Sequence, residues 1–218
     1  MDIQFLTRLP LFQGASQEQL HVLLPALDAR TRDYARGETI LQAGERTRHL
    51  GVVLSGGVTL ENHDAWGGRS ILGHVAPGQI FAETYACLPQ QPMLVSAVAA
   101  QDTRVLFLDV GRLLEGTCPH RDILLCNLLT LTAGKNLALS RRSFHTSAKT
   151  IRGRLLSYLS DQAVLQGSAS FTIPFDRQQL ADYLGVDRSA LSHELGKLRR
   201  EGLVSARKNR FLLHGEAL

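Results

Sequence analysis

The sequence predicts an α+β fold that combines an antiparallel β-roll of the jelly-roll type, a long helix and a C-terminal winged helix-turn-helix. Short apolar segments separated by glycines fill the first half, a leucine-rich helical stretch follows, and two short helices meet at Gly185. We expect an N-terminal helix and roll over 1–110, the long helix over 111–147 and the winged domain over 148–218.

The first predicted domain begins with a short helix and continues as strands. Ser16 can cap a helix that runs to Leu27 and has one apolar face. Five strand-forming segments follow between about Thr31 and Asp109: RGETILQAGE, HLGVVLSGGVTLE, GRSILGHVAPGQIF, MLVSAVAA and TRVLFLD. Repeated short strands with glycine turns favour an antiparallel barrel or roll, which can hold one small ligand in its interior.

A long helix is predicted after Asp109, and NLALSRRSF carries it toward Phe144. Five residues fit the a and d positions of a heptad seam: Leu124, Leu128, Leu131, Lys135 and Ala138. Such a seam predicts that two chains pair along this helix. The alternative is that the stripe packs against the roll of its own chain.

Two short helices joined by a glycine are predicted in FDRQQLADYLGVDRSALSHELGKLRREGLV. Asp176 and Gln179 form a capping box for the first helix, Gly185 supplies the turn, and Asp187 caps the second helix. The second helix has an apolar stripe on one face and basic residues on the other. This pattern indicates a helix-turn-helix, whose second helix contacts base edges in the major groove of DNA. A plain helical hairpin in a core is the alternative.

A wing and the charge distribution support the same interpretation. The segment GLVSARKNRFLLH predicts two short strands, with cations at the turn that can contact phosphate. Residues 149–218 hold 11 Lys and Arg against 7 Asp and Glu, whereas residues 1–148 hold 13 of each. The net charge of +4 therefore lies in the C-terminal part. A basic part joined to a neutral one favours a nucleic-acid binder with a separate sensing domain.

Several other classes of protein have little support in the sequence. The three cysteines Cys87, Cys118 and Cys126 are too widely spaced for a disulfide scaffold, and no CxxC pair or other metal site is predicted. Without an apolar run of about 18 residues or a secretory signal, we expect a cytoplasmic protein without membrane contact. An enzyme is the competing class, but no P-loop, nucleophile elbow or dinucleotide motif is present, and Glu83 and Asp109 have no acid-base partner.

The order of these motifs resembles that of the CRP/FNR family of bacterial transcription regulators, over nearly the whole chain. RGETILQAGE, LSGGVTL and APGQIFAE are similar to the family's cyclic-nucleotide-binding-like roll, and a long helix, TIRGRLLSYL and the helix-turn-helix follow in the family's order. The resemblance implies a homodimer that binds a pseudo-palindromic double-stranded DNA site, with a signal transmitted from the roll. RNA polymerase is then a further candidate partner. The alternative is a cyclic-nucleotide-type regulatory module that acts through protein partners without binding DNA.

The effector site departs from the family pattern. Cyclic-AMP-binding members clamp the cyclic phosphate with an Arg-Ser pair, and alignment places Met93 and Leu94 at those positions. Gly78 and Glu83 match the family, whereas Ala82 replaces a family glycine. We therefore expect that cyclic AMP is not the effector.

The resemblance implies an apolar effector pocket. Its expected residues are Gly78, Phe81, Glu83, Tyr85, Met93, Leu94 and Leu137. Such walls suit an uncharged or planar ligand, so the signal stays open between a small apolar molecule, haem with a diatomic gas, and thiol oxidation at Cys87 or Cys118. Haem ligands would come from His49, His63, His74, Cys87 and Met93. No iron-sulfur cluster is expected, because members that hold one carry an N-terminal cysteine cluster.

The resemblance also implies the DNA contacts. Base reading is expected from Arg188, Ser189, Ser192 and His193. Phosphate contacts are expected from Arg177, Gln178, the backbone at Asp187, Lys208 and Arg210. Arg188 can pair bidentately with a guanine. Many members have Glu and Arg where this chain has Ser189 and His193, so their operator sequence cannot be carried over.

Overall fold

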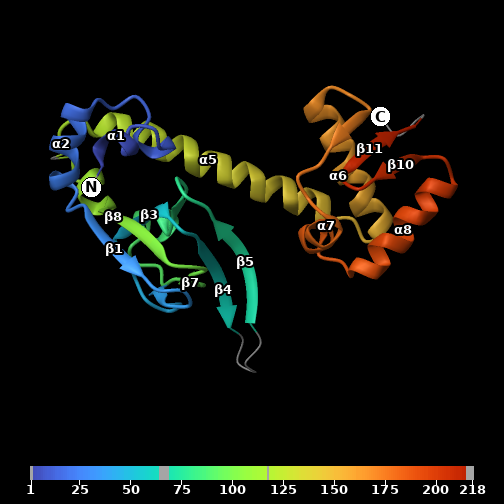
Figure 1. The fold of residues 1–218 in the computed structure, drawn as a ribbon, viewed down its shortest axis with the longest axis horizontal. Coiled ribbons are helices and arrows are strands. Elements are labelled where there is room, and N and C mark those ends of the chain that lie inside the picture. Colours follow the sequence, from blue (N-terminus) through green and yellow to red (C-terminus); the bar gives the residue numbers. More distant parts are fainter. Residues whose placement is uncertain (1, 64–68, 117, 215–218) are drawn as a thin grey trace. The chain divides into compact units, whose positions relative to one another are not determined.

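The computed structural model describes residues 2–63, 69–116 and 118–214. The chain forms two compact units, Met1–Gly134 and Lys135–Leu218. The boundary between them falls inside the segment 111–147 that the sequence predicts as a separate part, and the division into three domains stays a prediction. Figure 1 shows the mixed helical and antiparallel architecture, with a roll, a long helix and a C-terminal helix-turn-helix, and the predicted fold class is confirmed.

Short helices open the first unit. α1 (Ile3–Leu6) and a 3-10 turn (Pro10–Phe12) precede α2 (Gln17–Ala26). Ser16 caps α2: its hydroxyl accepts the Gln19 backbone N–H at 3.2 Å, and the Gln19 side chain accepts the Ser16 N–H at 2.9 Å. The predicted helix and its start are confirmed.

The strands of the first unit form two four-stranded antiparallel sheets, in the orders β1-β8-β3-β6 and β2-β7-β4-β5. Their bounds are β1 (Arg30–Tyr34), β2 (Thr39–Leu41), β3 (His49–Ser55), β4 (Val58–His63), β5 (Arg69–Val75), β6 (Ile80–Phe81), β7 (Ser96–Ala99) and β8 (Thr103–Asp109). Two short helices that the sequence patterns do not predict, α3 (Glu83–Cys87) and α4 (Val110–Leu114), follow β6 and β8. The predicted roll is confirmed.

Apolar side chains fill the interior of the roll. Phe81 is only 1% exposed, and its ring meets the Phe107 ring edge-on with 6.4 Å between centroids. A Cβ at Gly51 would lie 2.3 Å from the Phe81 ring, so the absence of a side chain on β3 makes room for this ring. Phe81 is therefore a core residue of the roll.

Ala82 joins β6 to α3 in a strained conformation. Its φ of 59° lies in the left-handed region, which costs a residue with a Cβ roughly 1–2 kcal/mol. We expect Ala82→Gly to raise the free energy of unfolding by about 1 kcal/mol, measured by urea denaturation. Ala26→Gly, in the right-handed backbone of α2, should lower it instead. An Ala82→Gly variant no more stable than the parent would contradict this explanation.

The long helix α5 (Arg121–Thr146) is confirmed, but two residues of its predicted seam, Leu124 and Leu128, are buried within their own chain. Leu124 and Leu128 are 1% and 5% exposed in the core of the first unit, and Leu131 packs against the same core. The Leu124 and Leu128 side chains are therefore not available to a second chain, whereas Leu131 is only partly buried. The alternative held open above, packing within the chain, is correct for Leu124 and Leu128. The roles of Leu131, Lys135 and Ala138 in a dimer stay predictions.

The exposed large apolar residues of α5 lie on the other side of the helix. They are Leu129, Leu137, Leu139 and Phe144, between 54% and 70% exposed. With about 100° of rotation per residue, these four positions fall within about 80° of Leu129, whereas all five predicted seam positions lie at least about 100° from it. We call these four residues the exposed apolar face of α5.

By length and composition, α5 is long and apolar enough to cross a membrane, contrary to the expectation from the sequence. Its N-terminal half instead packs on a protein core. The Asn127 amide donates hydrogen bonds to the backbone carbonyls of Leu11 and Gln13 at 2.9 and 2.8 Å. These contacts match a helix that belongs to a folded domain.

The second unit contains the winged helix-turn-helix. Its elements are α6 (Ile151–Gln166), β9 (Ser170–Thr172), α7 (Arg177–Leu184), α8 (Arg188–Arg200), β10 (Val204–Arg207) and β11 (Arg210–Leu213). The sheet has the order β10-β11-β9, so the two predicted wing strands are confirmed and β9 adds a third strand that the sequence did not predict. One apolar core, which includes Leu159, Leu180 and Leu195, joins α6, α7 and α8.

Candidate nucleic-acid interface

The helix-turn-helix forms as its capping residues predict. Asp176 and Gln179 make a reciprocal capping box at the start of α7, and Gly185 ends this helix with a φ of 63°. The Asp187 carboxylate accepts the backbone N–H groups of Ser189 and Ala190 at 2.8 and 3.0 Å, which starts α8. Asp176 therefore starts α7, Gly185 ends it in the left-handed region, and Asp187 starts α8, and these three residues together determine the turn between the two helices.

The expected base-reading residues lie exposed along α8. Among the described residues, the Arg188 guanidinium has no hydrogen-bond or ion-pair partner, so it is available to a ligand. The Ser189 hydroxyl donates to Asp187, and the Ser192 hydroxyl donates to the Arg188 carbonyl at 2.8 Å. Both serines can still accept a hydrogen bond. Arg188 is therefore the strongest candidate for base recognition, and His193 is also exposed.

The wing carries cations at its turn. Lys208 and Arg210 are exposed, and Lys208 has a φ of 56°, in the left-handed region that two-residue hairpin turns require. Asn209 closes the turn against the segment before α7, because the Asn209 carbonyl accepts the Ile173 N–H at 2.9 Å. The wing turn is thus fixed close to the start of α7, and the expected phosphate contacts of both cations stay predictions.

Arg177 has an additional role in the structure. Its guanidinium donates to the Lys208 carbonyl at 3.2 Å and lies over the Phe211 ring at 5.4 Å. Burial, followed by the nearby charge of Arg199, lowers the pKa of Arg177. Arg177 therefore links α7 to the wing, and its predicted phosphate contact is not tested. Gln178 is exposed and donates to Asp182 at 2.8 Å.

Two arginines that sequence reasoning missed hold the turn of the helix-turn-helix. Arg142, near the end of α5, donates to the Tyr183 and Asp182 carbonyls at 3.0 and 3.1 Å. Arg154, in α6, donates to the Leu184 and Gly185 carbonyls at 3.1 and 3.2 Å. These carbonyls end α7, where a helix lacks internal partners and favours positive charge. Long-range contacts of this kind leave no local sequence signal.

His145 joins the end of α5 to helices α6 and α7. It is 2% exposed, with Nδ1 at 3.0 Å from the Tyr183 hydroxyl and Nε2 at 3.4 Å from the Asp161 carboxylate. A neutral ring with its proton on Nε2 suits both neighbours, because Tyr183 can then donate to Nδ1. The ring also meets Tyr158 edge-on at 5.5 Å. This buried cluster fixes the end of α5 against α6 and α7.

The protonation of His145 should make the second unit less stable in acid. Burial, only partly offset by Asp161, lowers the pKa of His145 below its usual 6.5. The unfolded chain therefore binds this proton more readily than the folded chain does. The contribution of His145 to the free energy of unfolding is highest above pH 6.5 and decreases as the pH falls from 6.5 through the lowered pKa of His145 in the folded chain. The charged or titratable groups around the ring are Asp161, Tyr158, Tyr183 and Arg141, and Arg142 lies over the neighbouring Tyr183 ring.

Urea unfolding of the parent and of His145→Gln between pH 7.5 and 5 tests this expectation. The difference between the two curves isolates His145 from the other seven of the eight histidines in the chain. We expect the parent to lose more stability than the variant over this range. Parallel curves would contradict the assignment.

The expected effector-pocket residues lie in different environments. Phe81, Glu83 and Met93 are buried, at 1%, 6% and 3% exposure, whereas Leu94 is 75% exposed. The Tyr85 hydroxyl accepts the Leu94 backbone N–H at 3.2 Å, and Gly78 forms the turn before β6 with a φ of 84°. Leu137 belongs to the second unit, and its place in this pocket stays a prediction.

The thiols expected to sense oxidation are poorly suited to it. Burial, with a further contribution from Glu83, raises the pKa of Cys87. Burial also raises the pKa of Cys118, although Arg121 opposes this effect. Both side chains therefore favour the unreactive thiol over the thiolate.

Among the haem-ligand candidates, Met93 is buried, His49 is half-buried and His74 is exposed, while the side chain of His63 is outside the described residues.

A winged helix-turn-helix joined to a separate roll domain defines a DNA-binding transcription regulator with a sensor-type domain. Residues 31–116 match the cyclic nucleotide-binding domain family, and residues 153–218 match the Crp-like helix-turn-helix domain family. The chain belongs to the CRP/FNR family of transcription regulators.

Individual relatives agree with this assignment. A probable transcriptional regulator, flp, from Lacticaseibacillus casei is 26% identical over 211 residues, which cover 89% of this chain and 87% of the relative. The catabolite activator protein of Thermus thermophilus is 28% identical, with a TM-score of 0.53 over 94% of this chain and 93% of that structure. CprK in complex with OCPA shares the fold, with a TM-score of 0.68, 19% identity and 92% coverage of both chains.

Proposed function

We propose that this regulator acts as a homodimer on a pseudo-palindromic DNA site and that a signal received by the first unit controls it. The observation that carries the proposal is the exposed start of α8, where Arg188 has no partner among the described residues and Asp187 caps the helix. An α-helix presented in this way, beside a cationic wing, suits the major groove. The protein then works by binding DNA in the cytoplasm, with no catalytic step, and RNA polymerase is its candidate protein partner.

The exposed apolar face of α5 supports the dimer. Leu129, Leu137, Leu139 and Phe144 are large, exposed and on one side of a 26-residue helix. Two such helices can bury these side chains against each other, as in a coiled coil. Each dimer would then present two α8 helices, which is what a site with two half-sites requires.

Cyclic AMP is not the proposed effector. Met93 is buried and Leu94 carries no charge at the positions aligned with the family's Arg-Ser clamp. A cyclic phosphate would therefore lack its cation there. We expect this protein to bind cyclic AMP at least about tenfold more weakly than a relative that has the clamp does, as measured by isothermal titration. A smaller difference in affinity would contradict this step.

Selection of DNA from a random duplex pool by the full chain tests the proposed function. We expect an enriched inverted repeat whose half-sites are about 10 base pairs apart, with affinity that falls steeply as salt rises. A single half-site without a repeat would refute the dimer but not DNA recognition. An unchanged pool would refute sequence-specific binding, and with it the regulator's proposed mode of action.

A further inference from the structure

A cleft with a volume of about 590 Å³ opens on the first unit, and its lining includes none of the residues predicted for the apolar pocket. Arg46 and Arg48 approach it from the loop before β3, Ala86 and Pro89 from the α3 side, and Leu114 and Glu115 from the end of α4. This volume falls in the range of pockets that bind small organic molecules. The cleft thus combines two guanidinium groups with apolar walls.

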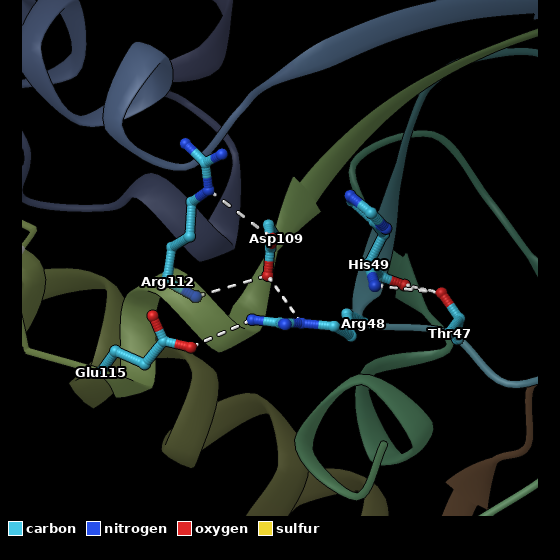
Figure 2. A network of polar contacts seen from close by, with 6 residues as sticks. All are labelled: Thr47, Arg48, His49, Asp109, Arg112 and Glu115. Carbon is cyan, nitrogen blue, oxygen red and sulfur yellow. Dashed lines mark hydrogen bonds and ion pairs between the residues drawn. The ribbon is translucent and has the colours of Figure 1, made fainter. Parts of the chain in front are cut away.

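One of these guanidinium groups already forms an ion pair with a carboxylate of the chain itself. Figure 2 shows Arg48 between two acidic side chains, with its Nη2 at 3.1 Å from Glu115 Oε1 and its Nε at 3.7 Å from Asp109 Oδ1. Glu115 is mostly exposed, so this pair is held weakly and can be exchanged. Among the described residues, exposed Arg46 has no ion-pair partner. The cleft can therefore accept a second carboxylate without leaving a buried charge unpaired.

Gly111 leaves room for the guanidinium of Arg48. A Cβ at Gly111 would lie 2.1 Å from Arg48 Nη2, so any side chain there would displace the guanidinium. Asp109 holds it from the other side and also accepts the Arg112 backbone N–H at 3.3 Å at the start of α4. The cationic side of the cleft is thus built by the first turn of α4, in addition to the loop before β3.

We propose that this cleft binds a small organic carboxylate with an apolar body. The carboxylate replaces Glu115 on Arg48 and pairs with Arg46, while the body lies against Ala86, Pro89 and Leu114. Guanidinium groups bind carboxylates with two parallel hydrogen bonds, and Glu115 shows that this side of Arg48 accepts such a group.

Such a ligand would supply a signal to the regulator, a consequence that rests on the proposed function. Glu115 follows the last residue of α4, and Arg121 begins α5 six positions later. Release of Glu115 from Arg48 would remove a contact between the loop before β3 and the end of α4. Binding at the cleft can be measured without DNA, so its failure is distinct from a failure of the proposed function.

Isothermal titration of the full chain with benzoate tests the proposal, with benzamide as the uncharged analogue and inorganic phosphate as an anion without an apolar body. We expect saturable benzoate binding, at least about tenfold weaker binding of both other compounds, and at least about tenfold weaker benzoate binding by Arg46→Gln and Arg48→Gln. Glu115→Gln should bind benzoate more tightly. Arg36 is an exposed arginine outside the cleft lining, so Arg36→Gln should leave the affinity for benzoate unchanged.

Three outcomes would overturn the proposal. Benzoate binding equal to that of benzamide would remove the arginines from recognition. Phosphate binding as tight as benzoate binding would indicate attraction of anions to the surface alone. An Arg36→Gln effect as large as the Arg48→Gln effect would place the site elsewhere.

Discussion

Leu129→Glu is expected to convert the protein to a monomer and to weaken binding of a two-half-site operator by roughly 10²–10⁴-fold, the advantage that linkage of two sites provides. Leu129 is 70% exposed at the centre of the exposed apolar face of α5. In a dimer, the variant would place two glutamates in an apolar interface, where a carboxylate without a partner is strongly unfavourable. Analytical ultracentrifugation gives the oligomeric state, and fluorescence anisotropy gives the affinity for the operator.

Ala138→Glu is the matched control. Ala138 is an exposed residue of the same helix, and it lies about 180° around the axis from Leu129. The same charge is introduced, so a general effect of charge or helix propensity would change both variants alike. We expect Ala138→Glu to remain a dimer. A monomeric Ala138→Glu with a dimeric Leu129→Glu would instead place the dimer interface on the side of α5 that carries Ala138.

The heptad pattern predicted the helix, but two residues of its predicted seam, Leu124 and Leu128, face the core of their own chain. Leu124, Leu128 and Leu131 repeat with the period that either a dimer seam or a face packed on a core would give. The sequence holds no local signal that separates these cases, because the partner of the stripe is distant in the chain. Only the packing of Leu124 and Leu128 in the core of the first unit decides between them.

The helix-turn-helix could be predicted in more detail because its signals are local. Asp176, Gln179, Gly185 and Asp187 act on backbone groups within a few residues, and each has its predicted capping role. The supports of the turn come from residues far along the chain. Arg142 reaches carbonyls about 40 positions away, and such pairings cannot be found from spacing alone.

Arg188→Ala is expected to weaken binding of the selected operator by roughly 1–3 kcal/mol per half-site and to relax the preference at one symmetric pair of base positions. The side chain begins α8, is exposed and has no partner among the described residues, so its loss leaves the intramolecular contacts of the unit in place. Binding to random DNA depends on phosphate contacts and should change much less. Anisotropy titrations with the operator, with each single-base variant of one half-site and with random duplex give both quantities.

Arg200→Ala is the control for charge, because Arg200 is an exposed arginine in the last turn of α8. It should reduce affinity for operator and random DNA by similar factors and leave the base preference unchanged, because a cation distant from the base-reading start of α8 contributes only through the general attraction to phosphate. If Arg188→Ala behaves like this control, with equal losses on both DNAs, Arg188 is not a base-reading residue. Recognition would then depend on Ser189, Ser192 and His193, whose hydrogen bonds discriminate less sharply between base pairs.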